Sequence, residues 1–242
     1  MNKKKREFLS PQIGNVPNIA WKKVKPNIWI SEPSLRTSEY SMNFVFMPPK
    51  KEYRLEGSGI ICALRGSNVS LIQPDSLCEA SLTVRESFLF ENGILQSGEN
   101  ECLLFVCRDE GDKNRYLDDI SGLKIKWSEY DINMYRTVPQ IYVDDYRVNL
   151  WYLGPHKHGG IHNHADEPSP FVEFHLQLRG TGWMVKYEDK ESKKELEKIN
   201  MVRGYTHNLF CTVEDKKVTY PWHEYIAGEK GSLFIVFEDT RI

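Results

Sequence analysis

The chain has 242 residues, of which 40% are hydrophobic and 12% aromatic, so it can bury one large core or two smaller ones. Its net charge of −2 and pI of about 6.4 give no electrostatic reason to expect nucleic-acid binding. No apolar run approaches the roughly 18 residues of a membrane span, and no signal-peptide core follows the basic residues 1–6. Five cysteines without a pairing rhythm predict free thiols in a reducing compartment, so we expect a cytoplasmic protein.

In chain order, residues 1–27 are predicted to form an extended arm. From residue 28 onward, short runs of β-forming residues alternate with turns rich in glycine, proline, serine and asparagine. This alternation predicts an all-β barrel or sandwich. The clearest helix candidate is 190–200, a run rich in lysine and glutamate with Leu196 and Ile199 spaced for one narrow apolar edge. The strands predicted in the first half include residues 29–30, 44–46, 60–64, 69–72, 88–90 and 103–106.

The two halves of the chain resemble each other, which indicates an internal repeat. The stretch GIICALRG at 59–66 parallels EFHLQLRG at 173–180, because both end in Leu-Arg-Gly with the same spacing. The glycines that end these stretches are 114 positions apart, whereas the last strands, 103–106 and 233–236, are 130 positions apart. We therefore expect a 16-residue insertion in the second half, in the interval that contains the charged run near 189–199.

All seven histidines lie in the second half, and the pair His162 and His164 predicts a metal site. Side chains on an extended strand alternate between faces, so an H-x-H pair would point both imidazoles to one side. The next predicted strand, 171–178, has an apolar face and a polar face that carries Glu173, and a glycine turn at 179–182 is expected to close it. Imidazoles and a carboxylate that converge from two strands suit a divalent transition metal.

H-x-H, a spacer and then E-x6-G resembles the first motif of the cupin superfamily, whose members are small β-barrels. The second cupin motif resembles Pro221-Trp222-His223, followed by a glycine turn and the final apolar strand 233–237. The chain departs from the family in its eight-residue spacer, where many cupins have three or four, and in P-x-H in place of P-x-x-H. The resemblance implies two tandem cupin-type jelly-roll barrels, all-β with few short helices. It also implies one divalent metal per chain, Fe(II) favoured over Mn, Ni or Zn, bound by His162, His164, Glu173 and His223.

The repeat and the resemblance together predict how the chain is divided. In the first half, Gly59 takes the position of Glu173 and Gly93 that of His223, and no histidine precedes residue 156. We therefore expect the first barrel to be a metal-free copy with a structural, lid or dimer-contact role. The expected parts are an N-terminal arm, a degenerate barrel without metal and a metal-binding barrel with the charged insertion, at residues 1–27, 28–115 and 116–242.

A second H-x-H, formed by His156 and His158, competes for the metal. Counting back from the turn glycine favours His162 and His164, so we expect the competing pair at the rim of the site. A carboxylate inside a barrel is costly to ionise unless a cation compensates it. In metal-free protein we therefore expect Glu173 to take up a proton more readily than a free glutamate.

His175 shares the predicted face of Glu173, which makes it the candidate catalytic acid or base, with a hydrogen-bonded interior histidine as the structural alternative. His207 lies in or beside the insertion, and we expect it in a loop or at the rim rather than on the metal. Four further residues are candidates for the cavity lining or for ordinary packing: Gln177, Trp183, Arg203 and Tyr225.

Three classes of function follow from these patterns. The favoured one is a metal-dependent cupin enzyme, of Fe(II)-type dioxygenase chemistry, that acts on a small polar organic molecule. The strand EFHLQLRG resembles a strand of the 3-hydroxyanthranilate dioxygenases over this short length. The second class is a non-redox isomerase, epimerase or lyase, since RGTGWM is similar to a stretch of the cupin-type phosphoglucose isomerases. The third is a non-enzymatic binding barrel with a structural metal. We expect a small-molecule ligand, no nucleic-acid or membrane partner, and a homodimer.

Overall fold

The computed structural model describes residues 20–25, 28–32, 35–36, 40–66, 68–76, 78–110, 126–138 and 140–241. Strands dominate these residues, and their one helical element is the 3-10 helix η1 (Pro74–Ser76). The predicted all-β class is confirmed, and no helix in the described residues has the length and apolar character to cross a membrane. Most of the expected arm and of the connection after residue 110 lies outside the described residues.

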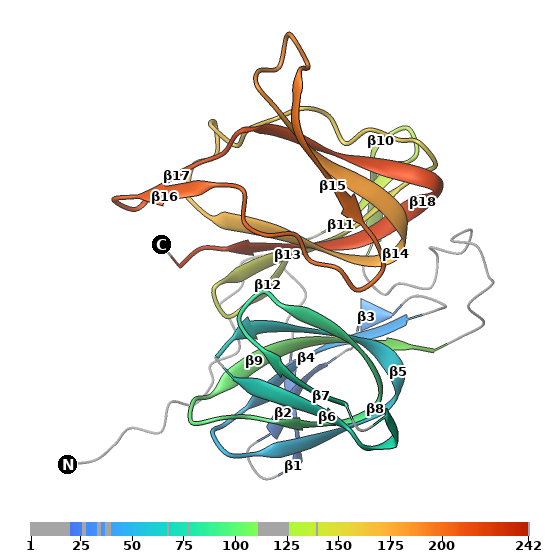
Figure 1. Cartoon of the computed structure of the whole chain (residues 1–242), viewed down its shortest axis with the longest axis vertical. Coiled ribbons are helices and arrows are strands. Elements are labelled where there is room, and N and C mark those ends of the chain that lie inside the picture. Colours follow the sequence, from blue (N-terminus) through green and yellow to red (C-terminus); the bar gives the residue numbers. More distant parts are fainter. Residues whose placement is uncertain are drawn as a thin grey trace.

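The described strands of the first half form one antiparallel sheet that curls on itself, in the lower part of Figure 1. Its neighbours run in the order β1-β2-β4-β9-β5-β8-β6-β7, and β3 pairs with β4. The six strands predicted in this half all fall within strands of the sheet. The bounds are β1 (Ala20–Lys25), β2 (Ile28–Glu32), β3 (Leu35–Arg36), β4 (Tyr40–Met47), β5 (Glu52–Arg65), β6 (Val69–Gln73), β7 (Cys78–Leu82), β8 (Ser87–Gln96) and β9 (Cys102–Asp109).

The second half forms another curled sheet, with the order β10-β11-β13-β18-β14-β15, and β12 pairs with β13. Strands β14 and β18 are long, and they curve round the upper barrel in Figure 1. A separate hairpin, β16-β17, projects from its side. The bounds are β10 (Lys126–Asp131), β11 (Met134–Val138), β12 (Ile141–Val143), β13 (Tyr146–Leu153), β14 (Val172–Tyr187), β15 (Glu195–Met201), β16 (Thr212–Glu214), β17 (Lys217–Thr219) and β18 (Trp222–Asp239).

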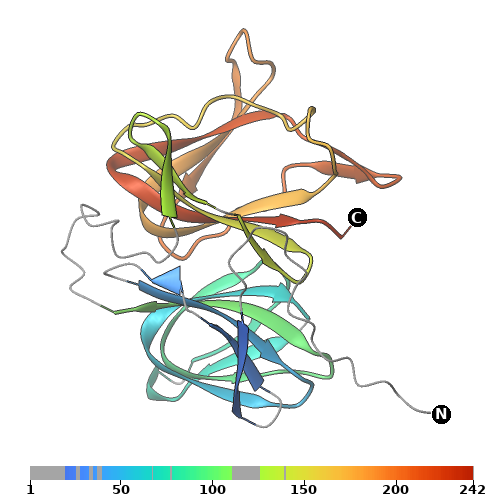
Figure 2. The same ribbon diagram turned by 180° about the vertical axis from the view of Figure 1, so that it is seen from behind.

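The two barrels pack against each other through a shared apolar core. Figure 2 shows the two curled sheets stacked one above the other. Strands β4, β5 and β9 face β13, β14 and β18 there, and each contributes every second residue. Phe105 of the first barrel meets Phe237 of the second edge-on, with ring centroids 5.5 Å apart. The Tyr146 hydroxyl donates to the Leu64 carbonyl at 2.5 Å. The apolar face predicted for 171–178 is therefore the face that covers the other barrel.

The strand registers reproduce the offsets of the repeat. Gly59 lies opposite Arg108 on β9, as Glu173 lies opposite Glu238 on β18. Both ladders then slip by one residue at the same place, after Ala63 in the first barrel and after Gln177 in the second. The two halves therefore place equivalent residues at equivalent positions of a barrel wall.

The extra residues of the second half lie in two places, so the expectation of one insertion is wrong. The Ala63 carbonyl accepts a hydrogen bond from Arg85 N, and the Gln177 carbonyl accepts one from Gly204 N. Arg85 and Gly204 are 119 positions apart, whereas their partners Ala63 and Gln177 are 114 positions apart. The second half therefore has five extra residues before Gly204. The remaining surplus follows Gly204, in the segment that carries the β16-β17 hairpin.

The predicted helix at 190–200 is wrong, because this segment forms a turn and strand β15. Ile199 pairs with Met184 of β14, and the ladder continues from Met201 to Glu195. A tight turn precedes it, in which the Asp189 carboxylate accepts hydrogen bonds from Ser192. Leu196 is 59% exposed, so the supposed apolar edge buries little. Pairing along β14 outweighs the weak helical preference of lysine and glutamate.

The expected turn at 179–182 is also wrong, because β14 continues through it to Tyr187. The strand is interrupted only by two register shifts, between Gln177 and Arg179 and between Gly180 and Gly182. Gly180 has φ 70°, and a Cβ there would lie 2.1 Å from the Gly231 carbonyl oxygen. The glycine therefore allows a sharp bend and a close approach of two strands rather than a reversal of the chain.

Candidate metal centre

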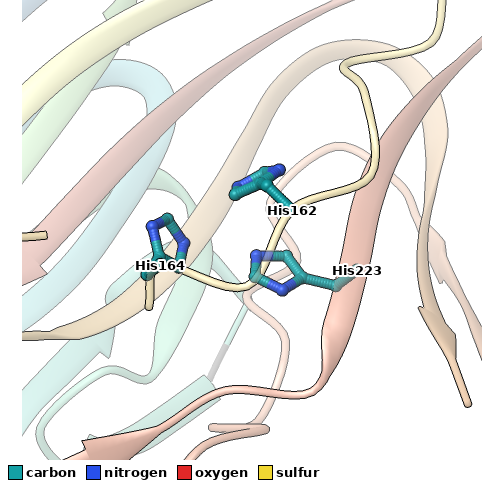
Figure 3. A group of neighbouring side chains, drawn as sticks. All are labelled: His162, His164 and His223. Atoms are coloured by element: carbon teal, nitrogen blue, oxygen red, sulfur yellow. The ribbon is translucent and has the colours of Figure 1, made fainter. Parts of the chain in front are cut away.

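Three histidines converge at one end of the second barrel. The ligand nitrogens of His162, His164 and His223 lie within 4.8 Å of one another, and in Figure 3 their rings point toward a common point. His223 comes from β18, and the other two come from the loop that precedes β14. These three side chains are among the four that the cupin resemblance assigned to a metal, and the structure brings them together.

His162 and His164 do not lie on an extended strand, so the geometric reason given for their convergence is wrong. His162 makes only an isolated bridge to His223. His164 has a left-handed backbone with φ 56°. This turn brings the two rings edge to face, with centroids 4.7 Å apart. A non-glycine residue in this conformation carries strain that is typical of functional sites.

For two of the three histidines, a hydrogen bond determines which ring nitrogen carries the proton and which keeps its lone pair. His162 Nδ1 lies 2.8 Å from the Gly160 carbonyl, and His223 Nδ1 lies 2.9 Å from the Pro221 carbonyl. A carbonyl only accepts, so each Nδ1 carries the proton and each neutral ring keeps a lone pair on Nε2. The Nε2 atoms of His223 and His164 are buried without a hydrogen-bond partner. Metal-binding histidines commonly show this outer hydrogen bond and free inner nitrogen.

Glu173 lies beneath this cluster, on the inner face of β14. Its Oε1 is 3.6 Å from His164 Nε2 and 3.9 Å from His223 Nε2, and its side chain is 7% exposed. Glu173 is thus adjacent to two of the three histidines, while the compact nitrogen cluster consists of the histidines alone.

The expectation that metal-free Glu173 takes up a proton is wrong in direction. Burial opposes its ionisation, but His175, His164 and His223 outweigh it and hold the Glu173 pKa well below its usual range. Burial also opposes protonation of His164, yet the Glu173 carboxylate raises the His164 pKa above its usual value. The surroundings therefore favour the ionised form of Glu173 and the protonated form of His164.

His175 and His207 form a buried pair behind Glu173. His207 Nδ1 lies 2.8 Å from the Asn208 carbonyl, so that nitrogen donates and His207 Nε2 accepts. This Nε2 accepts from the His175 backbone N–H at 3.1 Å and from His175 Nδ1–H at 2.8 Å. His175 consequently presents the lone pair of Nε2 toward Glu173 Oε1, 3.5 Å away. Burial is the main cause that lowers the His175 pKa to about 3, so the ring is neutral.

His207 lies in a loop outside the three-histidine cluster, as expected, but it is buried rather than at the rim. His207 is 2% exposed and directly contacts the candidate catalytic residue His175. Two acceptors, His175 Nε2 and the Glu173 carboxylate, face each other without a proton between them. Such an arrangement favours a cation at this position.

An aromatic wall that the sequence pattern did not predict surrounds His164. The Tyr220 hydroxyl accepts from Glu173 N–H at 2.6 Å and donates to the Phe171 carbonyl at 3.0 Å. The His164 ring packs against the rings of Phe171 and Tyr220, at centroid distances of 5.0 and 4.8 Å. Phe210 adds an edge contact to His223 at 4.7 Å. Tyr220 directly precedes the Pro-Trp-His run, and this position is the only signal that could have identified it.

The competing histidines lie apart from the cluster. His156 is exposed, and the His158 side chain is 62% exposed. His158 bridges to Ile226, and its Nδ1 lies 3.2 Å from Glu224 Oε2. Glu224 also accepts a hydrogen bond from the Tyr187 hydroxyl at 2.6 Å.

The four candidate lining residues differ in their roles. Gln177 and Tyr225 are buried in the barrel, where the Tyr225 hydroxyl donates to Gln177 Oε1 and Gln177 Nε2 donates to Ser232 Oγ at 2.7 Å. The Lys198 ammonium lies over the Trp183 ring, 5.1 Å from the centroid of that ring. Arg203 instead pairs with Asp109 of the first barrel, at 2.6 Å.

A cavity of about 540 Å³ opens beside the cluster, lined by His164, Phe171 and Tyr220. Its outer walls are the loop before β14 and the β16-β17 hairpin, which contribute Glu167 and Lys217. The exposed edge of the cluster at His162 and this cavity at His164 both give access from solvent.

The first barrel has apolar residues where the second has the candidate ligands. Leu55 pairs with Gly93 in the first barrel, at the position where His162 bridges to His223 in the second. Ile61 occupies the position that His175 has in the second barrel. At Gly59, a Cβ would lie 2.0 Å from the Cys107 carbonyl oxygen, and the Phe90 ring fills the space beyond. Among the described residues, the three-histidine cluster is the one group of potential metal ligands that is close enough to hold an ion.

Comparisons with known proteins give a distant likeness of shape. No protein-family model matches the chain, and no curated protein is similar to it in sequence. The chain is similar to the crystal structure of AerE from Microcystis aeruginosa, with 11% identity, TM-score 0.35, and 90% and 95% of the two chains covered.

Two other solved structures are similarly distant. A cupin 2 conserved barrel domain protein from Leptotrichia buccalis is 9% identical, with TM-score 0.32 and 91% and 92% covered. A Lactobacillus farciminis oxalate decarboxylase formate complex is 10% identical, with TM-score 0.36 and 95% and 88% covered. Likenesses this low assign neither a family nor a reaction.

Proposed function

We propose that this chain is a metal-dependent enzyme of cupin type that acts on a small polar organic molecule. One divalent transition metal would be held by His162, His164 and His223, with Glu173 as a fourth ligand or directly behind them.

The observation that carries this proposal is the pair of unpartnered Nε2 atoms on His164 and His223, buried beside the Glu173 carboxylate. A buried polar atom without a partner costs about 1–3 kcal/mol, so native proteins rarely keep two of them together. A single cation would satisfy both nitrogens and the carboxylate at once. The donor set, imidazole nitrogens and one carboxylate, suits iron, manganese, nickel or zinc.

Within this class we favour an Fe(II)-type dioxygenase. Histidine and carboxylate ligands with open positions are the set that non-haem iron oxygenases use. The metal would supply Lewis acidity and open positions for a chelated substrate and for dioxygen. The protein supplies the access, through the exposed edge at His162 and the cavity at His164.

The test begins with elemental analysis of protein purified without chelator or nickel affinity. Iron-loaded protein is then mixed with catechols, β-diketones and thiols while dissolved oxygen is recorded. We expect oxygen uptake with one of these groups and none with His164→Ala protein. Iron binding at one equivalent without uptake on any compound would count against the dioxygenase.

A non-redox isomerase, epimerase or lyase is the second candidate, because His207 orients the His175 ring so that its Nε2 lone pair is a candidate proton acceptor beside the centre. The matching test is anaerobic incubation in heavy water with sugar phosphates and small hydroxy acids, followed by NMR. Solvent deuterium at a carbon position, lost in His175→Gln protein, would favour this class over the oxygenase. Bound metal with neither activity would favour a binding barrel with a structural metal.

A further inference from the structure

The first barrel holds the segment of the second barrel that carries His207. The Ser87 hydroxyl donates to the Gly204 carbonyl at 2.7 Å and lies 3.3 Å from the Thr206 hydroxyl. The Thr206 hydroxyl in turn donates to the Arg85 carbonyl at 2.9 Å. Residues 204–206 are therefore tied by three polar contacts to Arg85, in the loop before β8, and to Ser87, at the start of β8.

A charged contact fixes the start of the same segment. Arg203 Nη2 lies 2.6 and 2.8 Å from the two carboxylate oxygens of Asp109, at the end of β9. Asp109 is held in turn by the Ser58 hydroxyl, which donates to it at 2.9 Å. The Asp109 side chain is 8% exposed, so this ion pair is shielded better than an ordinary surface pair.

On its other side the segment pairs with β14. Gly204 N donates to the Gln177 carbonyl at 2.8 Å, and Gln177 N donates to the Tyr205 carbonyl at 3.1 Å. The segment thus lies between the metal-site strand and the first barrel, and His207 follows it directly. A cavity of about 550 Å³ between residues 80–88 and 204–209 leaves space into which the segment could relax without these contacts.

We propose that the metal-free first barrel positions the metal site, with Ser87 and Thr206 as positioning residues that act through His207. Ser87 and Arg85 contact residues 204–206, which His207 follows directly. His207 contacts His175, and His175 in turn lies beside Glu173. The step to the metal rests on the proposed function. The step to His175 rests on hydrogen bonds of the protein alone.

The geometry explains why such support is needed. His207 Nε2 accepts two hydrogen bonds from His175, one from the backbone and one from Nδ1. A displacement of His207 would release His175 Nδ1–H, and the ring could then place its proton on Nε2, facing Glu173. The first barrel would thereby set the tautomer of the residue behind the centre, a role that needs no ligands of its own.

The first readout uses metal-free, full-length protein with ¹⁵N-labelled histidine, whose tautomers are read by NMR. In the wild type, His175 and His207 should both be protonated on Nδ1. Ser87→Ala should shift the signals of both, and Ser87→Thr, which keeps a hydroxyl, should restore them. His162 and His223 should keep their signals in each variant, and Ser70→Ala, a half-buried serine of β6, is the matched control. Unchanged His175 and His207 signals in folded Ser87→Ala protein would overturn the proposal.

The second readout is the visible spectrum and affinity of Co(II) bound to the same proteins. Ser87→Ala should alter the spectrum and weaken binding about tenfold, the lower end for loss of an outer-shell partner. If Ser87→Ala does not fold, Thr206→Val removes the bond to Arg85 at nearly constant shape and gives the same two readouts. Wild-type protein that binds no Co(II) would overturn the metal proposal, and the NMR result would still decide the positioning. Co(II) binding with identical spectra in all variants would show that the first barrel does not position the metal site.

Discussion

His162 and His223 exchange both of their backbone hydrogen bonds, from His162 N to His223 O at 3.0 Å and from His223 N to His162 O at 2.9 Å. Their rings are held side by side by the main chain, with centroids 4.4 Å apart. These main-chain bonds set the spacing of the two rings, as a preorganised metal site requires.

Replacement of each cluster histidine should therefore remove metal without unfolding the barrel. We expect His162→Ala, His164→Ala and His223→Ala to lower metal affinity by more than about 100-fold, since loss of outer-shell partners alone costs 10- to 100-fold. Isothermal titration with Co(II) measures this. His156→Ala and His158→Ala are the matched controls and should stay within about threefold of the wild type. If His158→Ala loses metal and His162→Ala retains it, the metal is bound by the other H-x-H pair and the proposed site is wrong.

The stoichiometry should be one metal per chain. The first barrel carries Leu55 and Gly93 where the second carries His162 and His223, and Phe90 closes the space beside Gly59. Elemental analysis after dialysis against excess metal should give one equivalent. Two equivalents would contradict the assignment of the first barrel as metal-free.

The parts of this structure that the sequence predicts are those set by side-chain alternation. Glu173, His175 and Gln177 lie inside the barrel, and Phe174 and Leu176 lie in the core between barrels, because a strand places alternate residues on opposite faces. The offset of 114 positions between the halves also comes from strand positions, since equivalent residues of β5 and β14 are 114 positions apart. The resemblance to cupins then brought His162, His164 and His223 together correctly.

The parts that failed depend on backbone geometry and pairing that local composition does not determine. His164 adopts φ 56°, a conformation that its residue type does not announce. The lysine-rich run near 190–200 favours a helix weakly, and the free edge of β14 makes it a strand. His207 is buried because segment 204–207 is held between two barrels, a tertiary contact with no local signal.

Metal-free protein should lose stability as the pH falls from about 6.5 toward 4.5. Burial is the main cause that lowers the pKa of His175 and of His223 to about 3, whereas both titrate near 6.5 in an unfolded chain. Between these values the unfolded chain binds more protons, so the free energy of unfolding decreases as the pH falls. The slope approaches about 1.4 kcal/mol per pH unit for each histidine.

Two neighbouring groups also titrate in this range. Burial lowers the His207 pKa, which adds to the slope, and burial raises the Glu238 pKa to about 7, which opposes it. The three histidines together outweigh Glu238, so the sign is unchanged. The His164 pKa is raised, so its contribution to the free energy of unfolding is complete below pH 6.5, the ordinary pKa of histidine. That contribution is lost only as the pH rises above this value. The Glu173 pKa is lowered, so its contribution is lost only below its ordinary value of 4.5. Urea denaturation at pH 7, 6 and 5 measures the slope, which His175→Gln should reduce. An unchanged slope in that variant would show that His175 does not titrate as a buried neutral ring.

The last prediction concerns the charge on Glu173. Glu173→Gln keeps the shape of the side chain and the backbone bond to the Tyr220 hydroxyl, so the barrel should stay folded. The variant removes the negative charge beside His164 and His223, which a divalent cation would otherwise compensate. We expect metal affinity to fall at least tenfold, and the increase in Tm on metal addition to shrink accordingly, since stabilisation by a ligand follows its affinity.

Glu238→Gln is the matched control, because Glu238 lies directly opposite Glu173 on β18 and pairs with Arg147 at 2.6 Å. It removes a neighbouring carboxylate without touching the cluster, so metal affinity should stay within a few-fold of the wild type. The comparison requires Tm with and without Co(II) for all three proteins. If Glu173→Gln and the wild type gain the same Tm on metal addition, Glu173 is not a ligand. The site would then be a three-histidine centre, and the carboxylate would serve only to raise the His164 pKa in the metal-free state.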